Sequence, residues 1–336
     1  MSGVSLEVRV EKLRLAAPFR ISGFVFEEQD VAVVELHDGG HRGRGEASGV
    51  YYLDDKIENI VTSIESRRTA IESGLDRGSL QRLLPPGGAR NAVDCAMWEL
   101  EASRKATPVG ELAGIGTLHP LTTTFTLGAD EPRKMADGAR KYNHARRIKL
   151  KLTGDLDTDI ARIQAVRAAR PDVWIGVDAN QGYSIETLKK LLPELVTAKV
   201  SLLEQPLPRG RETDLQGFIS PIPVAADESA LCLADLPGLI GRFQIVNIKL
   251  DKCGGLTEGL AMARKAREIG LGVMVGNMVG TSLAMAPGFV LGQLCDVVDL
   301  DGPIFLSRDR TPAATYVDGQ IRCGEEVWGS GRSPTA

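Results

Sequence analysis

The sequence predicts an α/β fold in which a parallel β/α barrel follows a smaller N-terminal α+β domain. From about Leu121 onward, eight short apolar runs that resemble buried strands alternate with segments of helical periodicity. Five of these runs end in a charged residue, and the charged residues recur at intervals of about 25 residues. One strand, one helix and two loops occupy about that length, so the spacing indicates one charged group per β/α repeat.

The charged residues at the predicted strand ends are Lys151 in KLKLTG, Asp178 in GVDAN, Glu204 in LLEQP, Asp227 in VAADES and Lys249 in NIKLDK. Side chains two positions apart on a strand share a face, so Lys149 points the same way as Lys151, and Asn180 the same way as Asp178. Active sites of parallel barrels lie at the C-terminal ends of the strands. We therefore expect these side chains to form one polar site there.

The chain divides into three parts. Residues 1–118 are expected to form the α+β domain, because SLEVRVEKLRL and DVAVVELHDG alternate like antiparallel strands and ARNAVDCAMWELEASRKA has helical periodicity. Residues 119–305 are expected to form the barrel. The tail, residues 306–336, contains a strand and turn around TYVDGQIRCG that is too short to fold alone. We expect the tail to pack back on the first domain.

Composition argues against several classes of function. With 336 residues and 43% hydrophobic content, the chain can bury a full barrel and a second domain. A formal charge of −4 and the lack of a Lys/Arg run argue against nucleic acid and against an anionic membrane as partners. The N-terminus MSGVSLEVRV lacks the apolar core of a signal peptide, so we expect a cytoplasmic protein. Five scattered cysteines without a CxxC motif argue against a disulfide framework and a zinc site.

Three carboxylates on consecutive strands predict a magnesium site. Asp178, Glu204 and Asp227 would offer oxygen ligands, which Mg²⁺ prefers, and they would leave coordination positions open for water or substrate. Each acid taken alone could equally be the ion-pair partner of a lysine. The three in this order favour a metal.

The lysines predict a proton transfer. Burial and neighbouring positive charge lower the pKa of a lysine, so Lys151 is the expected base, and Lys149 would tune it or contact a substrate oxygen. Lys249 approaches from the other side of the ring, and two bases across one carbon can move a proton from one face to the other. That reaction is a racemisation or epimerisation next to a carboxylate, with Mg²⁺ holding the developing enediolate. A Schiff-base aldolase would also use a barrel lysine, but it would not need three acids.

The motifs KLK, VDAN, EQP, ADES and NIKLDKCGG together resemble the muconate-lactonizing-enzyme subgroup of the enolase superfamily, over nearly the whole chain. The resemblance implies a (β/α)₇β TIM-like barrel with an N-terminal capping domain, one Mg²⁺ on Asp178, Glu204 and Asp227, and catalytic lysines at Lys151 and Lys249. It also implies a small-molecule substrate and a homo-oligomer, since relatives form dimers or octamers. The mandelate-racemase subgroup is disfavoured, because it carries an Asp on the sixth strand and a His on the seventh.

Within the subgroup, the eighth strand favours a dipeptide epimerase. Asp299 and Asp301 in VVDLDGP share a face, and this pattern resembles the acids that hold the terminal ammonium of the substrate in dipeptide epimerases. We therefore expect epimerisation at the C-terminal residue of a dipeptide. The alternatives are an N-acetyl or N-succinyl amino acid racemase, an o-succinylbenzoate synthase and a non-catalytic homologue, although every expected base and ligand is present.

The side chain of that C-terminal residue is expected to be apolar or cationic rather than acidic. Glutamate-selective relatives supply an arginine from the loop after the first strand, whereas PFRISGFVFEEQD places Phe24 there. Glu27 and Glu28 would repel an acidic side chain, and aromatic residues such as Phe24 and Tyr52 would suit an apolar or cationic one. The same aromatic residues could instead be ordinary packing between cap and barrel.

Overall fold

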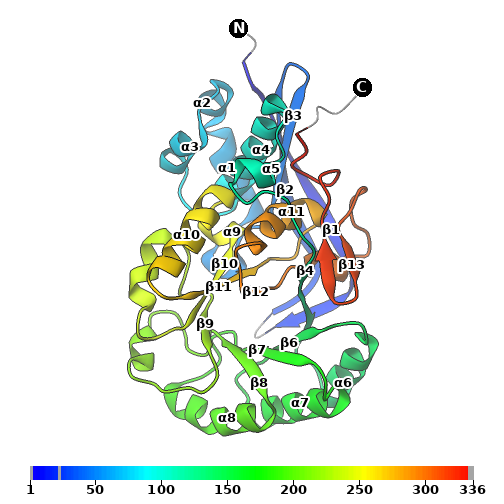
Figure 1. Cartoon of the computed structure of the whole chain (residues 1–336), viewed down its shortest axis with the longest axis vertical. Coiled ribbons are helices and arrows are strands. Elements are labelled where there is room, and N and C mark those ends of the chain that lie inside the picture. Colours follow the sequence, from blue (N-terminus) through cyan, green and yellow to red (C-terminus); the bar gives the residue numbers. More distant parts are fainter. Residues whose placement is uncertain (1–2, 22–23, 332–336) are drawn as a thin grey trace.

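The computed structural model describes residues 3–21 and 24–331, which form a barrel and a smaller capping domain (Figure 1). In Figure 1 the helices of the cap lie at the top, in blue and cyan, and the barrel lies below them in green to orange. Among the described helices, none combines the length and the apolar character that crossing a bilayer requires.

An antiparallel sheet and one long helix are the centre of the cap. The sheet has the order β1-β2-β3, and α4 (Gly88–Lys105) packs against β3. The packing is close because Gly43 and Gly45 lack side chains: a Cβ on either glycine would lie 2.0 Å from a backbone oxygen of α4. The other cap elements are β1 (Ser5–Ile21), β2 (Phe24–Asp38), β3 (His41–Ala47), η1 (Tyr51–Leu53), α1 (Ile57–Glu65), α2 (Arg68–Glu72), α3 (Arg77–Leu83) and α5 (Val109–Leu112).

Eight parallel strands form the barrel, in the spatial order β12-β11-β10-β9-β8-β7-β6-β5, which confirms the predicted fold class. A single parallel bridge between Thr123 and Val298 joins the two ends of that order and nearly closes the ring. The strands are β5 (Thr124–Leu127), β6 (Arg147–Lys151), β7 (Trp174–Asp178), β8 (Val200–Glu204), β9 (Val224–Ala226), β10 (Ile245–Lys249), β11 (Gly272–Gly276) and β12 (Val297–Val298).

Helices cover the outside of the barrel, and one of them is a 3₁₀-helix of seven residues. This helix is η3 (Leu233–Leu239), and it contains Pro237. The remaining elements are α6 (Pro132–Lys141), α7 (Leu156–Ala169), α8 (Ile185–Thr197), η2 (Glu212–Leu215), α9 (Leu250–Cys253), α10 (Leu256–Glu268), α11 (Ser282–Gly292) and η4 (Gly302–Phe305).

The C-terminal segment contacts both parts of the molecule. The hairpin of β13 (Thr315–Val317) and β14 (Gln320–Arg322) pairs with β4 (Leu121–Thr122), just before the first barrel strand. Farther along, the indole of Trp328 donates a hydrogen bond to the backbone oxygen of Arg44 in the cap, over 2.9 Å. The exact boundaries between cap, barrel and tail stay predictions.

Side-chain alternation explains why the polar residues gather at one end of the barrel. Four apolar residues form a small cluster inside it: Leu202, Ala225, Met274 and Val297. Glu204 follows Leu202 by two residues along its strand, and Asp227 follows Ala225 in the same way. The apolar residues therefore form a floor, and the next inward-facing positions form a polar layer above it.

The close approach of β3 to α4 can be tested with a pair of glycine substitutions. Gly45→Ala places a methyl group against the α4 backbone and should lower the free energy of unfolding by about 2 kcal/mol or more. Gly40→Ala is the matched control, because an added Cβ there has no neighbour within 4 Å. Urea unfolding of both variants measures the difference, and equal stabilities would contradict the packing argument.

Candidate active site

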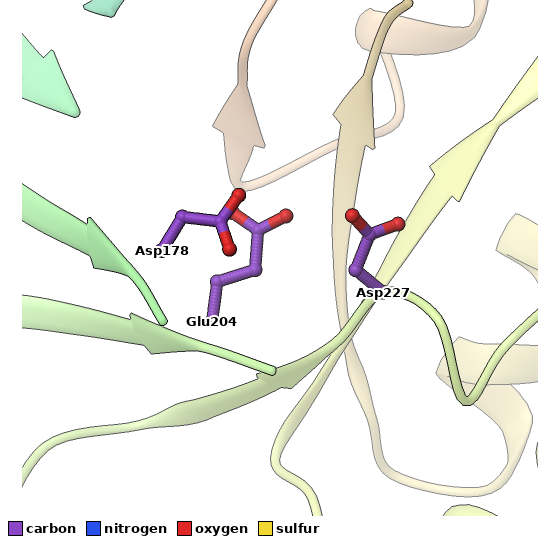
Figure 2. Close-up of side chains that lie close together, drawn as sticks. All are labelled: Asp178, Glu204 and Asp227. Atoms are coloured by element: carbon purple, nitrogen blue, oxygen red, sulfur yellow. The ribbon is translucent and has the colours of Figure 1, made fainter. Parts of the chain in front are cut away.

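The acids predicted at the strand ends come together at one end of the barrel. Asp178 and Glu204 are the last residues of β7 and β8, and Asp227 directly follows β9. All three are buried, with no more than 1% of their surface exposed. One oxygen from each carboxylate lies within 4.8 Å of the others, and Figure 2 shows the carboxylates grouped around a common space. This arrangement could hold one metal ion.

Two of the predicted lysines flank the acids. The Nζ atom of Lys151, at the end of β6, donates a hydrogen bond to Asp178 Oδ2 over 2.6 Å. The Nζ atom of Lys249, at the end of β10, donates to Asp227 Oδ2 over 2.6 Å. Strands β7, β8 and β9 lie between β6 and β10 in the sheet order, so the two amines reach the acids from opposite sides.

The third predicted lysine, Lys149, connects the acids to the last strand. Its Nζ atom donates a hydrogen bond to Asp299 and lies 3.4 Å from Glu204 Oε2. Asp299 also accepts a hydrogen bond from the hydroxyl of Thr124. Lys149 is therefore surrounded by carboxylates. It precedes Lys151 by two residues on β6 and lies deeper in the barrel than Lys151.

Asp299 and Asp301 lie at the seam of the barrel, where the last strand, β12, meets the first strand, β5. Asp301 accepts a hydrogen bond from the backbone nitrogen of Thr126 over 2.6 Å. Burial, and then the charge of Asp299, raise the pKa of Asp301 to about 7. Both aspartates are therefore already engaged in closing the barrel, and their role in binding an ammonium group stays a prediction.

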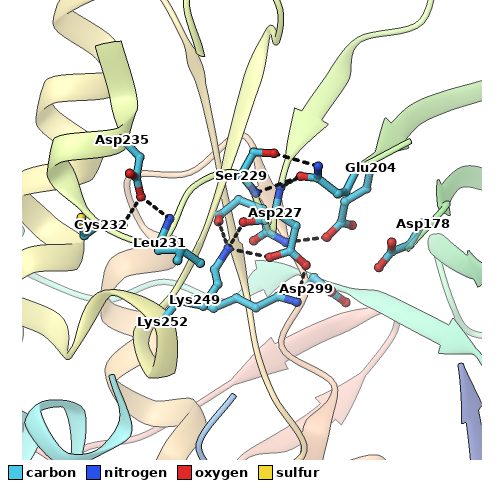
Figure 3. A network of polar contacts seen from close by, with 12 residues as sticks. Asp178, Glu204, Asp227, Ser229, Leu231, Cys232, Asp235, Lys249, Lys252 and Asp299 are labelled. Carbon is cyan, nitrogen blue, oxygen red and sulfur yellow. Dashed lines mark hydrogen bonds and ion pairs between the residues drawn. The ribbon is translucent and has the colours of Figure 1, made fainter. Parts of the chain in front are cut away.

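Lys252 is a residue of the site that the strand pattern did not reveal. It lies in α9, the four-residue helix that follows β10, and is 1% exposed. Its Nζ atom donates to Asp227 Oδ1 and to the Asp227 backbone oxygen, both over 2.5 Å, and to the Asn247 backbone oxygen over 3.0 Å (Figure 3). All three ammonium hydrogens are used, so Lys252 positions Asp227. The sequence does contain a signal that could have revealed Lys252: it is the second lysine of KLDK, and one helical turn brings it back toward the strand.

Negative charge exceeds positive charge at this end of the barrel. Among the described residues that form the acid cluster, line the cavity or bond to the cluster through an amine, six buried carboxylates meet four buried amines: Asp178, Glu204, Asp227, Glu228, Asp299 and Asp301 against Lys149, Lys151, Lys249 and Lys252. Burial, and then the charge of Asp178, raise the pKa of Glu204 to about 7. Burial and the charge of Asp227 raise the pKa of Glu228 to about 8. With all ten groups ionised, negative charge exceeds positive charge by two, and one divalent cation would balance that excess.

The chemistry of the donor atoms fits Mg²⁺. The cluster consists of carboxylates, the hard oxygen ligands that Mg²⁺ prefers. The side-chain oxygens of Asn180 and Asn247 are buried and lack hydrogen-bond partners in the described structure. Mg²⁺ keeps several water molecules when it binds to proteins, and such waters donate hydrogen bonds to oxygens of this kind. Asp178, Glu204 and Asp227 are therefore a suitable ligand set.

The charged end of the barrel opens into a cavity of about 380 Å³ beneath the cap. Two residues that the sequence predicted to bind substrate, Tyr52 and Asn180, line this cavity, and the Tyr52 hydroxyl is buried without a hydrogen-bond partner. The predicted contact from Phe24 concerns a side chain that lies outside the described residues.

Comparison with known proteins identifies the family. Residues 4–114 match the mandelate racemase / muconate lactonizing enzyme N-terminal domain, and residues 133–324 match the enolase C-terminal domain-like family. The chain belongs to the enolase superfamily.

Two curated relatives of this enolase-superfamily protein are isomerases. The chain is 38% identical over 319 residues to L-Ala-D/L-Glu epimerase of Escherichia coli, with 94% of this chain and 99% of the relative covered. It is 41% identical over 291 residues to N-acetyl-D-glutamate racemase of a Pseudoalteromonas species, with 86% and 91% covered. This superfamily member is therefore an isomerase, an epimerase or racemase of amino acid derivatives.

Two solved structures of the superfamily are similar over nearly the whole chain. An enolase family member from Agrobacterium tumefaciens, with sodium and L-Ala-L-Glu bound, has a TM-score of 0.94 and 38% identity over 97% of this chain and 100% of that chain. A dipeptide epimerase from Methylococcus capsulatus, complexed with Mg and L-Arg-D-Lys, has a TM-score of 0.89 and 29% identity over 96% and 97%.

Carboxylates control the basicity of the lysines in this superfamily member. Burial lowers the pKa of Lys149 and of Lys249, but the adjacent carboxylates outweigh burial and leave both pKa values raised. The expected lowering of a lysine pKa by burial and neighbouring positive charge included a divalent cation, and it stays a prediction. A divalent cation among the same acids would supply the positive charge that lowers these pKa values.

The cap is attached to the barrel directly beyond Lys249. Asp251, two residues farther along the chain, accepts a hydrogen bond from the backbone nitrogen of Ser48 over 3.1 Å. It also accepts one from the side chain of Asn91 over 3.3 Å, and both donors belong to the cap. These contacts hold the end of β10 against the cap.

The buried Asp251 makes stability depend on pH. Burial raises the pKa of Asp251 to about 7, so the folded protein holds a proton that the unfolded chain releases above about pH 4. The free energy of unfolding therefore falls as pH rises from about 4 to about 7. Asp251→Asn cannot ionise and should remove about 3 kcal/mol of the fall between pH 5 and pH 8. Urea unfolding at both pH values tests this, with the exposed Asp157→Asn as control, and an unchanged pH dependence in Asp251→Asn would contradict it.

Proposed function

We propose that the protein is a Mg²⁺-dependent epimerase that inverts the α-carbon of the C-terminal residue of a dipeptide. The observation that carries the proposal is the position of two buried amines, Lys151 and Lys249, on opposite sides of one carboxylate cluster. The similarity to L-Ala-D/L-Glu epimerase, and to structures with bound dipeptides, supports a dipeptide substrate.

Asp178, Glu204 and Asp227 would hold the Mg²⁺ ion. Bound there, the ion would supply positive charge to the carboxylate of the substrate, where negative charge grows as the α-proton leaves. Lys252 keeps the Asp227 carboxylate turned into the cluster through its two hydrogen bonds to that residue. With the ion bound, the substrate carboxylate would face the acids, and the adjacent α-carbon would lie between the two flanking amines.

Lys151 and Lys249 would exchange roles between the two directions of the reaction. An unprotonated amine on one side removes the α-proton, and the C–H electron pair passes into the carboxylate to give a planar enediolate. The protonated amine on the other side then delivers a proton to the opposite face of the same carbon. Lys149, which is bonded to Asp299, would remain protonated and contact a substrate oxygen.

Asp299 and Asp301 would bind the ammonium group of the dipeptide. Their carboxylates lie at the seam of the barrel and line the cavity. The raised pKa of Asp301 indicates that positive charge is lacking there, and a substrate ammonium group would supply it.

A second candidate function is racemisation of an N-acyl amino acid. The 41% identity to N-acetyl-D-glutamate racemase favours it, and so does the pairing of Asp299 with Lys149, which leaves less free negative charge for a substrate cation. An N-acyl substrate has no ammonium group and would need none of that charge.

The two-base mechanism can be tested by substitution of each lysine. Lys151→Ala and Lys249→Ala should each reduce epimerisation by about 10³-fold or more, because one face of the α-carbon loses its acid or base. In D₂O each variant should still exchange the α-proton of one epimer, and the two variants should differ in which one. Mass spectrometry of both epimers measures this exchange, with the exposed Lys190→Ala as control. Normal exchange of both epimers in both variants would rule out the mechanism.

The metal site can be tested apart from the reaction. Asp178→Asn should weaken Mg²⁺ binding by about 100-fold or more, because it removes one ligand and one negative charge. Calorimetric titration with Mg²⁺ measures the affinity, and Glu212→Gln, outside the cluster, is the control. Unchanged affinity in Asp178→Asn would show that the three acids are not the metal ligands.

The substrate class can be decided by incubating the protein with two panels of candidate substrates in D₂O that contains Mg²⁺. One panel contains dipeptides and the other contains N-acetyl and N-succinyl amino acids, with deuterium uptake at the α-carbon as the readout. The proposal predicts uptake with dipeptides at a kcat/KM about tenfold or more above that for N-acyl compounds. Uptake restricted to N-acyl compounds would assign the second function instead.

A further inference from the structure

We propose that the site selects a substrate whose epimerised residue carries a cationic side chain, lysine or arginine. This inference rests on the proposed function, because it concerns the side chain on the carbon between Lys151 and Lys249. It goes beyond the reaction, since the similar structures named above hold dipeptides with different C-terminal residues, L-Ala-L-Glu and L-Arg-D-Lys.

The geometry of the site gives the direction of that side chain. The proposed function already places three of the four groups on the reacting carbon. The proton transfers to a lysine, the carboxylate faces the acid cluster, and the amide nitrogen points toward Asp299 and Asp301. The side chain must then point at the remaining wall of the cavity, which belongs to the cap. Strand β2 and the segment around η1 form that wall.

The β2 part of the wall is an alternating row of residues. Phe26, Glu28 and Asp30 lie two positions apart on the strand, share a face and line the cavity. Glu27 lies between them and points to the other face of the strand. The sequence-based expectation that Glu27 and Glu28 both repel an acidic side chain is therefore wrong for Glu27, and Asp30 takes its place.

Buried oxygens without partners indicate what kind of group the wall would bind. Asp30 Oδ1 and Tyr52 OH in the cap wall, and Glu228 Oε2 on the barrel segment after β9, are buried atoms of cavity-lining residues and have no hydrogen-bond partner in the described structure. Glu228 is 2% exposed, so its carboxylate cannot turn to bulk water. A buried acceptor without a donor is costly, and the ammonium of lysine or the guanidinium of arginine supplies three to five N–H donors. An alkyl side chain or a carboxylate supplies none.

The aromatic residues of the wall suit the stem of such a side chain. The rings of Phe26 and Tyr51 have centroids 5.5 Å apart, and those of Tyr51 and Tyr52 lie 5.1 Å apart, both in edge-to-face geometry. Lysine and arginine bury their methylene groups against apolar surfaces while the charged end reaches polar groups. Aromatic faces also attract a cation directly.

Among the described residues, the cations of the cap leave Asp30 without a hydrogen-bonded partner, although Lys12 pairs with Glu28. Lys56 pairs with Asp54 over 2.8 Å, and Lys12 pairs with Glu28 over 2.6 Å. Both lysine side chains are more than half exposed, at 68% and 55%, so these are surface ion pairs of small net strength. The ammonium of Lys12 lies 3.8 Å from Asp30 Oδ1, which is too long for a hydrogen bond.

The proposal is tested by comparing three side chains of similar length. L-Ala-L-Lys, L-Ala-L-norleucine and L-Ala-L-Glu are incubated with the enzyme and Mg²⁺ in D₂O, and α-deuterium uptake gives kcat/KM for each. The lysine dipeptide should exceed the norleucine dipeptide by about tenfold and the glutamate dipeptide by about 100-fold. Equal or faster exchange of the glutamate or norleucine dipeptide would overturn the proposal.

The same three side chains as N-acetyl amino acids separate this proposal from the proposed function. If only the N-acetyl compounds exchange, the dipeptide assignment fails, and the ranking of lysine, norleucine and glutamate within that series still decides the side-chain proposal. If neither series exchanges, both proposals are overturned.

Substitutions in the wall locate the selectivity. Glu28→Gln and Asp30→Asn should each lower the ratio of kcat/KM for lysine over norleucine by about fivefold or more. Asp30→Lys should raise kcat/KM for the glutamate dipeptide. Glu27→Gln is the matched control, since the same change on the opposite face of β2 should leave the ratio unaltered. A ratio that is equally insensitive to all four substitutions would show that the wall does not select the side chain.

Discussion

The buried excess of negative charge at the mouth of the barrel is the constraint on which the site depends. Six carboxylates and four amines are buried there, and each amine is held by at least one acid. Ionised groups are costly to bury unless opposite charges and hydrogen bonds compensate for the lost water. The two remaining negative charges make a divalent cation part of the electrostatic balance, and the same cation would make the flanking lysines usable as bases.

The two domains contribute different things to one cavity. The barrel supplies the acids and the lysines, while the cap supplies the wall that a substrate side chain would meet. The contacts of Asp251 with Ser48 and Asn91 fix the cap beside the strand that bears Lys249. A change in the wall can therefore alter the preferred substrate side chain without disturbing the acids and bases.

Hydrogen bonds at the barrel seam show that one residue can serve both fold and site. Asp299 accepts from Thr124 on β5 and from Lys149 on β6, so it joins the last strand to the first two. Lys252 joins β10 to the end of β9 in a comparable way, through Asp227 and the backbone of Asn247. The polar layer thus contributes to closing the barrel as well as to its chemistry.

The sequence by itself determined the fold class, the family and the clustering of the charged residues at the strand ends, because a two-residue alternation and a regular repeat are local properties of the chain. It did not reveal Lys252, which follows a strand and reaches Asp227 through a helical turn, and it assigned Glu27 to a face that Asp30 occupies instead. It also did not show which carboxylates surround Lys149 and Lys249 and raise their pKa values. Tertiary structure decided these points, since the charge around a buried amine depends on side chains that come together from several strands.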